Sequence, residues 1–197
     1  MTLPRFYPIF DGTDWLARML PLGVEFVQLR VKDRPEAELR TQVREGLALA
    51  RRHGATLVVN DYWRIAIDEG AQWIHLGQED LAEADLAAIR RAGLRVGIST
   101  HDHEELERAL AADADYVALG PVYPTILKKM KWHEQGLERV TEWKRRVGDR
   151  PLCAIGGMTP ERALDALAAG ADLVSVVTDI TLNPDPEARV REWLERV

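Results

Sequence analysis

Polar side chains that could hold a phosphorylated ligand alternate with apolar ones around position 30. Gln28, Arg30 and Lys32 are separated from one another by Leu29 and Val31. Because a β-strand turns successive side chains to opposite faces, we expect the three polar ones to form a row at the carboxyl end of a strand. Arginine and lysine are well suited to phosphate oxygens, so the row predicts an anion site. The alternative is an edge strand whose charges face water.

Two aspartates follow the next two predicted strands. Asp61 comes after the apolar run 56–59 and Asn60, and Asp80 follows the run 73–76. Mg²⁺ typically takes one or two carboxylates together with waters and substrate phosphate oxygens. The two aspartates are therefore candidate magnesium ligands, although Asp80 could instead cap the helix that follows it.

A second anion site is predicted near the carboxyl end of the chain. Gly156 and Gly157 follow a seventh predicted strand, and Val177 and Thr178 follow an eighth. Glycines let backbone N–H groups approach a phosphate, and α/β barrels often bind a phosphate between these two loops. Two facing anion sites suggest a reaction that joins two phosphorylated small molecules, although a Gly-Gly pair also serves simple turns.

The histidines and the cysteine point to packing rather than to chemistry. His101 and His103 have no further ligands at the spacing of a zinc site, and His75 lies within a predicted strand. We therefore expect His75 to be a packed barrel residue. The single cysteine, Cys153, lies in an apolar run and is expected to be a buried side chain in a reducing cytoplasm.

The composition predicts a globular protein without a basic surface. The 26 Lys and Arg residues and 32 Asp and Glu residues give a net charge of −6, which argues against nucleic-acid binding. The first ten residues lack the apolar core of a signal peptide, and no apolar run approaches the roughly 20 residues that span a bilayer. We expect a cytoplasmic protein that does not bind membranes.

Strand and helix patterns alternate along the whole chain. Apolar runs predict eight strands, over residues 6–10, 24–32, 56–59, 73–76, 95–98, 116–119, 151–155 and 173–177. Helices are expected between and after them, the clearest over 36–53, 81–92 and 186–197, with Thr13 or Asp14, Asp102 or His103, and Thr159 as starting residues. Eight such units favour a single-domain (β/α)₈ TIM barrel over residues 1–197, with its active site at the carboxyl ends of the strands.

With these residues assembled, the chain resembles the thiamine-phosphate synthase family. The matching motifs occur in family order over nearly the whole sequence: Gln28-Leu29-Arg30-Val31-Lys32, Val59-Asn60-Asp61, His75-Leu76-Gly77-Gln78-Glu79-Asp80, Gly97-Ile98-Ser99-Thr100-His101, Gly120-Pro121-Val122-Tyr123-Pro124-Thr125, Ile155-Gly156-Gly157 and Val174-Ser175-Val176-Val177-Thr178.

The resemblance implies a condensation of hydroxymethylpyrimidine diphosphate with thiazole phosphate or its carboxylate, which releases pyrophosphate. It implies that residues 28–32, with Asn60 and Ser99, bind the pyrimidine diphosphate, and that Asp61 and Asp80 hold Mg²⁺. Arg30, Lys32, Ser99 and Lys128 would be the catalytic residues, with Lys128 on the departing pyrophosphate. Thr125, Gly157, Val177 and Thr178 would position the thiazole phosphate. The enzyme would be a transferase, and a homo-oligomer is possible.

One position departs from the family pattern. The family commonly has Pro-Thr-x-Thr-Lys, whereas this chain has Leu127 where the second threonine is expected. Leu127 cannot supply a hydroxyl contact, which affects the details of phosphate binding. The basic segment 128–133 is expected either to close over the site or to be an exposed loop.

Two other functions are compatible with such a barrel. A thiazole tautomerase would use a histidine such as His101 and would not need a site for a diphosphate and Mg²⁺. A non-catalytic sensor of phosphorylated ligands would keep the pocket alone. The paired carboxylates and the cationic row favour the synthase over both.

Overall fold

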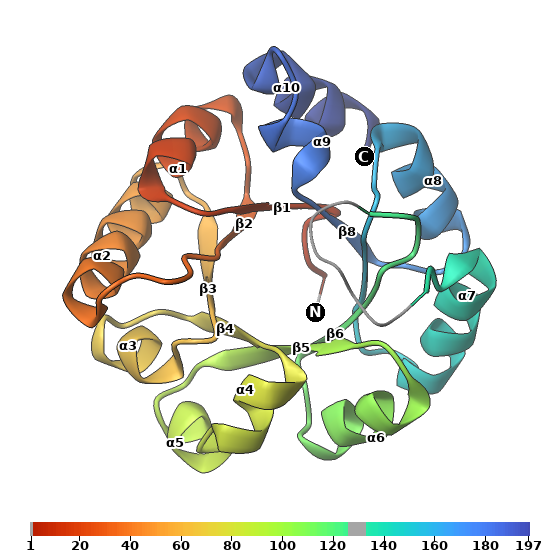
Figure 1. Cartoon of the computed structure of the whole chain (residues 1–197), viewed down its shortest axis with the longest axis horizontal. Helices are drawn as coiled ribbons and strands as arrows, with labels where there is room; N and C mark the ends of the chain where they lie inside the picture. Colours follow the sequence, from red (N-terminus) through yellow and green to blue (C-terminus); the bar gives the residue numbers. More distant parts are fainter. Residues whose placement is uncertain (1, 126–132) are drawn as a thin grey trace.

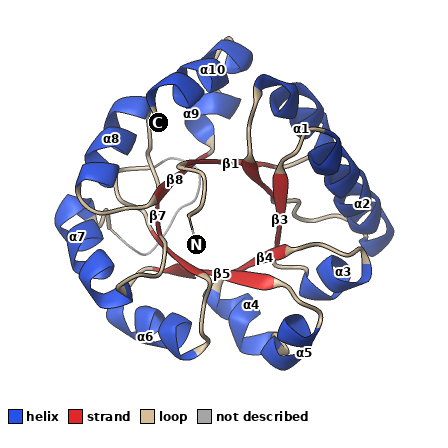
Figure 2. Cartoon of the chain, turned by 180° about the vertical axis from the view of Figure 1, so that it is seen from behind, coloured by secondary structure: helices blue, strands red, loops and turns tan. Residues whose placement is uncertain are grey.

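The computed structural model is a closed barrel of eight parallel strands surrounded by helices (Figures 1 and 2), and it describes residues 2–125 and 133–197. The strands pair in sequence order, and the last one closes on the first. They are β1 (Phe6–Phe10), β2 (Phe26–Leu29), β3 (Thr56–Asn60), β4 (Trp73–Leu76), β5 (Arg95–Thr100), β6 (Tyr116–Leu119), β7 (Leu152–Ile155) and β8 (Leu173–Val176). The predicted (β/α)₈ TIM barrel is confirmed.

The helices of the described residues form the outer ring. They are α1 (Thr13–Met19), a 3₁₀ turn (Leu20–Leu22), α2 (Glu36–Arg52), α3 (Trp63–Asp68), α4 (Gln78–Glu83), α5 (Leu86–Arg91), α6 (His103–Ala111), α7 (Gly136–Val147), α8 (Pro160–Ala168), α9 (Thr178–Thr181) and α10 (Pro186–Arg196). Asp102 and Thr159 accept hydrogen bonds from the backbone N–H groups of Glu105 and Arg162, so both predicted helix caps are confirmed.

Two apolar layers follow from the alternation of side chains along the strands. The barrel interior holds an aromatic cluster of Tyr7, Phe26, Trp73 and Tyr116. The ring centroids of the contacting pairs are 4.6–6.5 Å apart. The opposite strand faces pack against the helices in a larger apolar core. Strands that are covered on both faces read as nearly continuous apolar runs, which is why the sequence identifies them.

Three local predictions were wrong. Strand β2 ends at Leu29, so Arg30 and Lys32 lie beyond it rather than within it. The helix expected over 81–92 is two helices, α4 and α5, because the chain is extended at Ala84 and Asp85 caps the second helix. At the start of α1 the N-cap residue is Gly12, which makes no side-chain cap, instead of Thr13 or Asp14.

The last loop contains an element that periodicity did not predict. After β8, the short helix α9 begins at Thr178 and lies between the barrel mouth and α10 (Figure 1). Four residues are too few to show helical periodicity in the sequence. Within residues 2–125 and 133–197, we find no helix that combines the length and apolar character of a membrane-crossing segment.

Candidate active site

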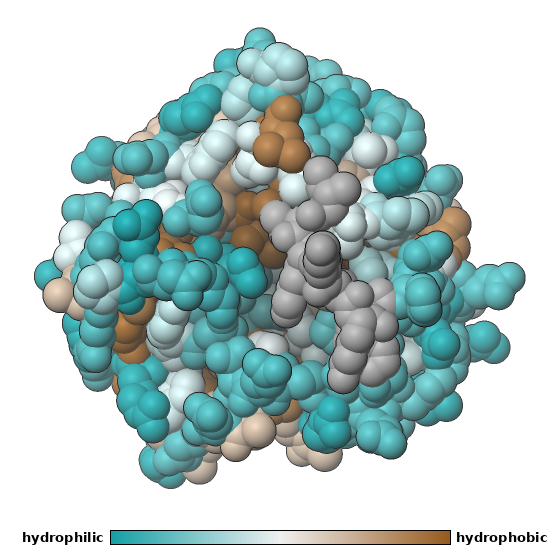
Figure 3. Space-filling view, in the orientation of Figure 1, coloured by the Kyte–Doolittle hydropathy of each residue, from teal (hydrophilic) through white to brown (hydrophobic). Residues whose placement is uncertain are grey.

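The predicted site residues gather at the carboxyl ends of the strands, the face seen in Figure 1. In the space-filling view of this face, hydrophilic side chains cover most of the rim, and apolar atoms appear beside the hollow near the centre (Figure 3). Parallel strands in a barrel all end at this face, so residues far apart in the sequence meet here.

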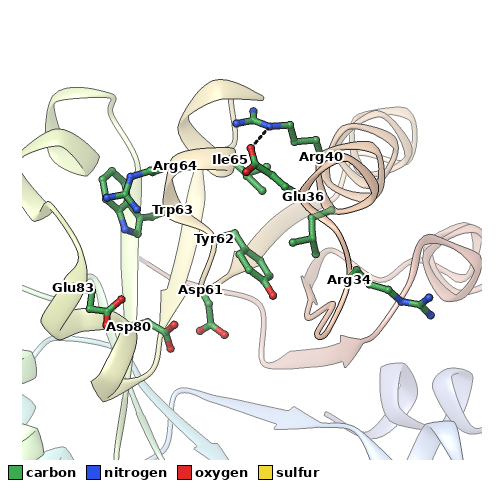
Figure 4. Close-up of a pocket in the computed structure, with 11 residues that line it drawn as sticks. Arg34, Glu36, Arg40, Asp61, Tyr62, Trp63, Arg64, Ile65, Asp80 and Glu83 are labelled. Carbon is green, nitrogen blue, oxygen red and sulfur yellow. Dashed lines mark hydrogen bonds and ion pairs between the residues drawn. The ribbon is translucent and has the colours of Figure 1, made fainter.

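Asp61 and Asp80 lie side by side at the ends of β3 and β4 (Figure 4). Asp61 has a left-handed backbone with φ of 63°, which turns the chain sharply after β3, and its N–H donates to the His75 carbonyl at 2.8 Å. An aspartate tolerates this conformation better than most residues. Its carboxylate accepts from Asn60 Nδ2 at 2.5 Å and forms an ion pair with the Lys32 ammonium.

Burial, followed by the negative charge of Asp61, raises the pKa of the Asp80 carboxyl. Asp80 lies in the first turn of α4, and the N-cap of that helix is Gly77, so the predicted alternative of a capping role is wrong. The carboxylates therefore repel each other, and a divalent cation between them would relieve that repulsion. Among the described residues, no group of three or more His, Cys, Asp or Glu side chains could form a more complete metal site. Two carboxylates fit Mg²⁺, whose other ligands are usually waters and phosphate oxygens.

A cavity of about 490 Å³ opens beside the two carboxylates (Figure 4). Its wall includes Asp61, Asp80, Tyr62, Trp63 and three arginines, which are Arg34, Arg40 and Arg64. Arg40 is engaged by Glu36 and Asp68, each at 2.9 Å, and Arg64 lies over the Trp63 ring. The cavity wall therefore contains both cationic and anionic side chains, and the arginines lie in the same wall as the two carboxylates.

The polar row around position 30 rises from the barrel interior to the surface. Gln28 is 1% exposed, Arg30 is half-buried, and Lys32 is exposed. The Arg30 guanidinium lies close enough to His75 to disfavour the charged imidazole, which places it at the mouth. By contrast, the side chains of Leu29 and Val31 pack in the outer core, so only their backbone groups could contact a ligand.

Below the mouth, buried polar groups form a chain of hydrogen bonds across the barrel. Gln28 Nε2 donates to the Tyr7 hydroxyl at 2.7 Å, and the Tyr7 and Tyr116 hydroxyls are 2.9 Å apart. His75 Nδ1 is 2.7 Å from the Tyr116 hydroxyl, and its Nε2 is 2.8 Å from Ser99 Oγ. Burial lowers the pKa of His75 to about 4, which fits its predicted role as a packed residue.

The loops after β7 and β8 supply the other side of the mouth. Gly157 has φ of 63°, and a Cβ there would overlap the Pro124 carbonyl, so glycine is required. Arg162 donates to the Gly157 carbonyl at 2.6 Å and lies over the Tyr123 ring, which ties this loop to the one after β6. Val177 precedes α9 and Thr178 begins it, so both lie at the expected place.

The structure thus gathers most of the predicted site residues at one face. Some of the others lie outside the described residues. Thr125 is half-buried in the loop after β6, next to Pro124. Lys128 and Leu127 lie outside the described residues, as does most of the expected lid 128–133. Tyr7 and Tyr116, whose hydroxyls link Gln28 to His75, were not among the predicted site residues. Their only signal was an aromatic residue at an inward-facing strand position, which ordinarily indicates packing.

Comparison with known proteins identifies the family of this chain. The family model described as thiamine monophosphate synthase matches residues 7–180. A thiamine-phosphate synthase of Rhizobium etli is 63% identical over 98% of this chain and 95% of its own length. One from Cronobacter sakazakii is 47% identical over 96% of this chain and 90% of its own.

A solved structure extends the similarity to the whole barrel. Thiamine phosphate pyrophosphorylase from Pyrococcus furiosus superposes with a TM-score of 0.85 at 25% identity, over 97% of this chain and 94% of that one. The chain therefore belongs to the thiamine monophosphate synthase family and is, as an enzyme, a transferase of thiamine biosynthesis.

Proposed function

We propose that this chain condenses hydroxymethylpyrimidine diphosphate with thiazole phosphate, or with its carboxylate, to form thiamine phosphate and pyrophosphate, with CO₂ as a further product when the carboxylate reacts. The observation that carries the proposal is the paired carboxylates of Asp61 and Asp80, which lie beside the cations at the end of β2. A diphosphate leaving group needs charge stabilisation as it departs, and this side of the mouth offers groups that could provide it.

Each side chain has a role that its position supports. Asp61 and Asp80 would hold Mg²⁺, which when bound offsets negative charge on the diphosphate. Arg30 and Lys32 would bind diphosphate oxygens, and Asn60 orients Asp61 through its 2.5 Å hydrogen bond. Lys128 is assigned to the departing pyrophosphate on the family resemblance.

The second substrate would bind across the mouth. The loop with Gly157, the start of α9 at Val177 and Thr178, and Thr125 surround the expected place of the thiazole phosphate. By the family resemblance the substitution is dissociative: the bond to the diphosphate breaks, pyrophosphate leaves, and the thiazole nitrogen then attacks the pyrimidine-stabilised cation, so no protein nucleophile is needed. The cytoplasmic location and a homo-oligomeric state are parts of this proposal that rest on the sequence.

The test is product formation by the purified protein. With both precursors and Mg²⁺, chromatography should show thiamine phosphate and a matching release of pyrophosphate. Asp80→Ala should lose at least about 100-fold in turnover while its melting curve stays cooperative. Glu79→Gln, which removes an exposed charge at the adjacent position of the same helix, is the matched control.

The same preparation separates the alternatives. Isomerisation of the thiazole carboxylate without the pyrimidine substrate would identify a tautomerase, for which His101 is the candidate. Ligand binding with no turnover by folded protein would identify a sensor. Either outcome, or full activity of Asp80→Ala, would contradict the proposed synthase site.

A further inference from the structure

Five side chains from five strands form one unbroken hydrogen-bonded chain through the barrel. The order is Gln28, Tyr7, Tyr116, His75 and Ser99, and each neighbouring pair of atoms is 2.7–2.9 Å apart. Tyr7 and Tyr116 are buried, and the hydrogen bonds of both hydroxyls lie within this network, whereas Gln28 Oε1 has no partner in it. The two ends, Gln28 and Ser99, are residues that the family resemblance assigns to the pyrimidine diphosphate.

Each tyrosine hydroxyl has one proton, so the orientation of the Gln28 amide, whose Nε2 faces Tyr7, sets the direction of the whole series of hydrogen bonds. Gln28 Nε2 donates to Tyr7, so the Tyr7 proton is left for Tyr116. The Tyr116 proton must then go to His75 Nδ1, which is therefore unprotonated. A neutral imidazole with a bare Nδ1 carries its proton on Nε2 and donates it to Ser99 Oγ.

The ends of the chain are left with opposite hydrogen-bonding roles. Ser99 Oγ accepts from His75, so its own proton is free to be donated toward the mouth. Within the described part of the chain, Gln28 Oε1 is a buried side-chain atom with no hydrogen-bond partner, and it is free to accept. A buried acceptor without a partner is costly in a folded protein unless a ligand or water meets it.

We propose that Tyr7, Tyr116 and His75 are positioning residues that set Gln28 as a hydrogen-bond acceptor and Ser99 as a donor for the pyrimidine substrate. The inference rests on the proposed function for the identity of the ligand, but not for the direction of the chain. Reversing the roles would require the Gln28 amide to turn over and all three intervening protons to move. The site therefore selects a ligand edge with a donor opposite Gln28 and an acceptor opposite Ser99.

The direction of the hydrogen bonds can be measured in the protein without substrate. ¹⁵N NMR shows which nitrogen of the His75 ring carries the proton. The chain has five histidines, and the His75 signals are assigned by their loss in a His75→Gln variant. We expect a neutral His75 ring with the proton on Nε2. A ring with the proton on Nδ1 would overturn the inference, whether or not the protein makes thiamine phosphate.

A variant and a matched control test the role of the tyrosine. Tyr116→Phe removes the donor to Nδ1, so the Nε2–H tautomer should lose population. Thr100→Val removes another buried hydroxyl from the same strand as Ser99, where it accepts from Trp143 and donates to the Ala118 carbonyl, and it should leave the tautomer unchanged. If Tyr116→Phe left the His75 tautomer unchanged, the proposed donation from the Tyr116 hydroxyl to His75 Nδ1 would be contradicted.

Kinetics then connect the chain to the substrate. Tyr116→Phe should raise KM for the pyrimidine diphosphate by about 3- to 10-fold, the effect of one weakened hydrogen bond, with a smaller change in kcat. In a Ser99→Ala background the same substitution should have almost no further effect, because the donor it orients is gone. If the effects of Tyr116→Phe and Ser99→Ala on KM were fully additive, Tyr116 would have only a structural role and would not position Ser99.

A second variant covers the case in which Tyr116→Phe does not fold. Tyr7→Phe leaves the donation from Tyr116 to His75 intact but removes the acceptor of Gln28 Nε2. The His75 tautomer should therefore stay as in the wild type while KM rises. A Tyr7→Phe variant with wild-type KM would contradict the assignment of Gln28.

Discussion

Replacing Asp80 with Asn removes one of the two negative charges that meet at the barrel mouth, with almost no change in shape. Two unit charges about 4 Å apart repel by about 4 kcal/mol at an effective dielectric constant of about 20. Water reaches Asp80, and Lys32 offsets part of the Asp61 charge, so we expect about 1 kcal/mol of repulsion to remain. In EDTA, Asp80→Asn should therefore melt about 2–4 °C above the wild type.

The sign of the pH dependence follows from the raised pKa of Asp80. The folded protein holds this proton more tightly than the unfolded chain, so the wild type loses stability as the pH rises through the folded-state pKa. Below the unfolded-state pKa of about 4, Asp80 is protonated in both states, and the repulsion disappears. The advantage of Asp80→Asn should thus be present at pH 7 and absent near pH 3.

Calorimetry with and without Mg²⁺ makes the experiment specific. Mg²⁺ should raise the melting temperature of the wild type but have little effect on Asp80→Asn, because one ligand is gone. Glu79→Gln removes a charge from the same helical turn at an exposed position and should respond to Mg²⁺ like the wild type. A lower melting temperature of Asp80→Asn than of the wild type in EDTA, or an equal gain of both proteins from Mg²⁺, would refute the repulsion between Asp61 and Asp80 and their shared metal site.

Three other substitutions or treatments test the packing that supports the site. Gly97→Ala would place a Cβ 2.0 Å from Cζ of the buried Tyr116 ring and should cost about 1–3 kcal/mol in urea unfolding. Asp179→Ala removes both hydrogen bonds to Arg189, at 2.7 and 2.8 Å, and should cost about 2 kcal/mol by the same measurement. Burial raises the pKa of the Cys153 thiol, so a thiol reagent should react at least about 100-fold more slowly with folded than with urea-unfolded protein.

The sequence by itself determined the order of the elements and the fold class. Each strand is an apolar run with glycines, prolines or polar residues at its ends, and these signals are local. The errors occurred at the boundaries of elements. Strand β2 ends before Arg30, although the Arg30 N–H still donates to the carbonyl of Phe10 in the neighbouring strand β1. The helix break at Ala84 and Asp85 follows from an aspartate cap inside an otherwise helical pattern.

The sequence also predicted which polar residues would lie at the mouth, because parallel strands in a barrel all end at one face. Only the tertiary structure decided which of them touch. Closure of the barrel brings Asp61 beside Asp80 and the Lys32 ammonium onto Asp61. It also joins Tyr7 to Tyr116, which are 109 positions apart. Periodicity tells which face a side chain occupies, but the partner it meets across the barrel is set by strand order and register, which no local pattern contains.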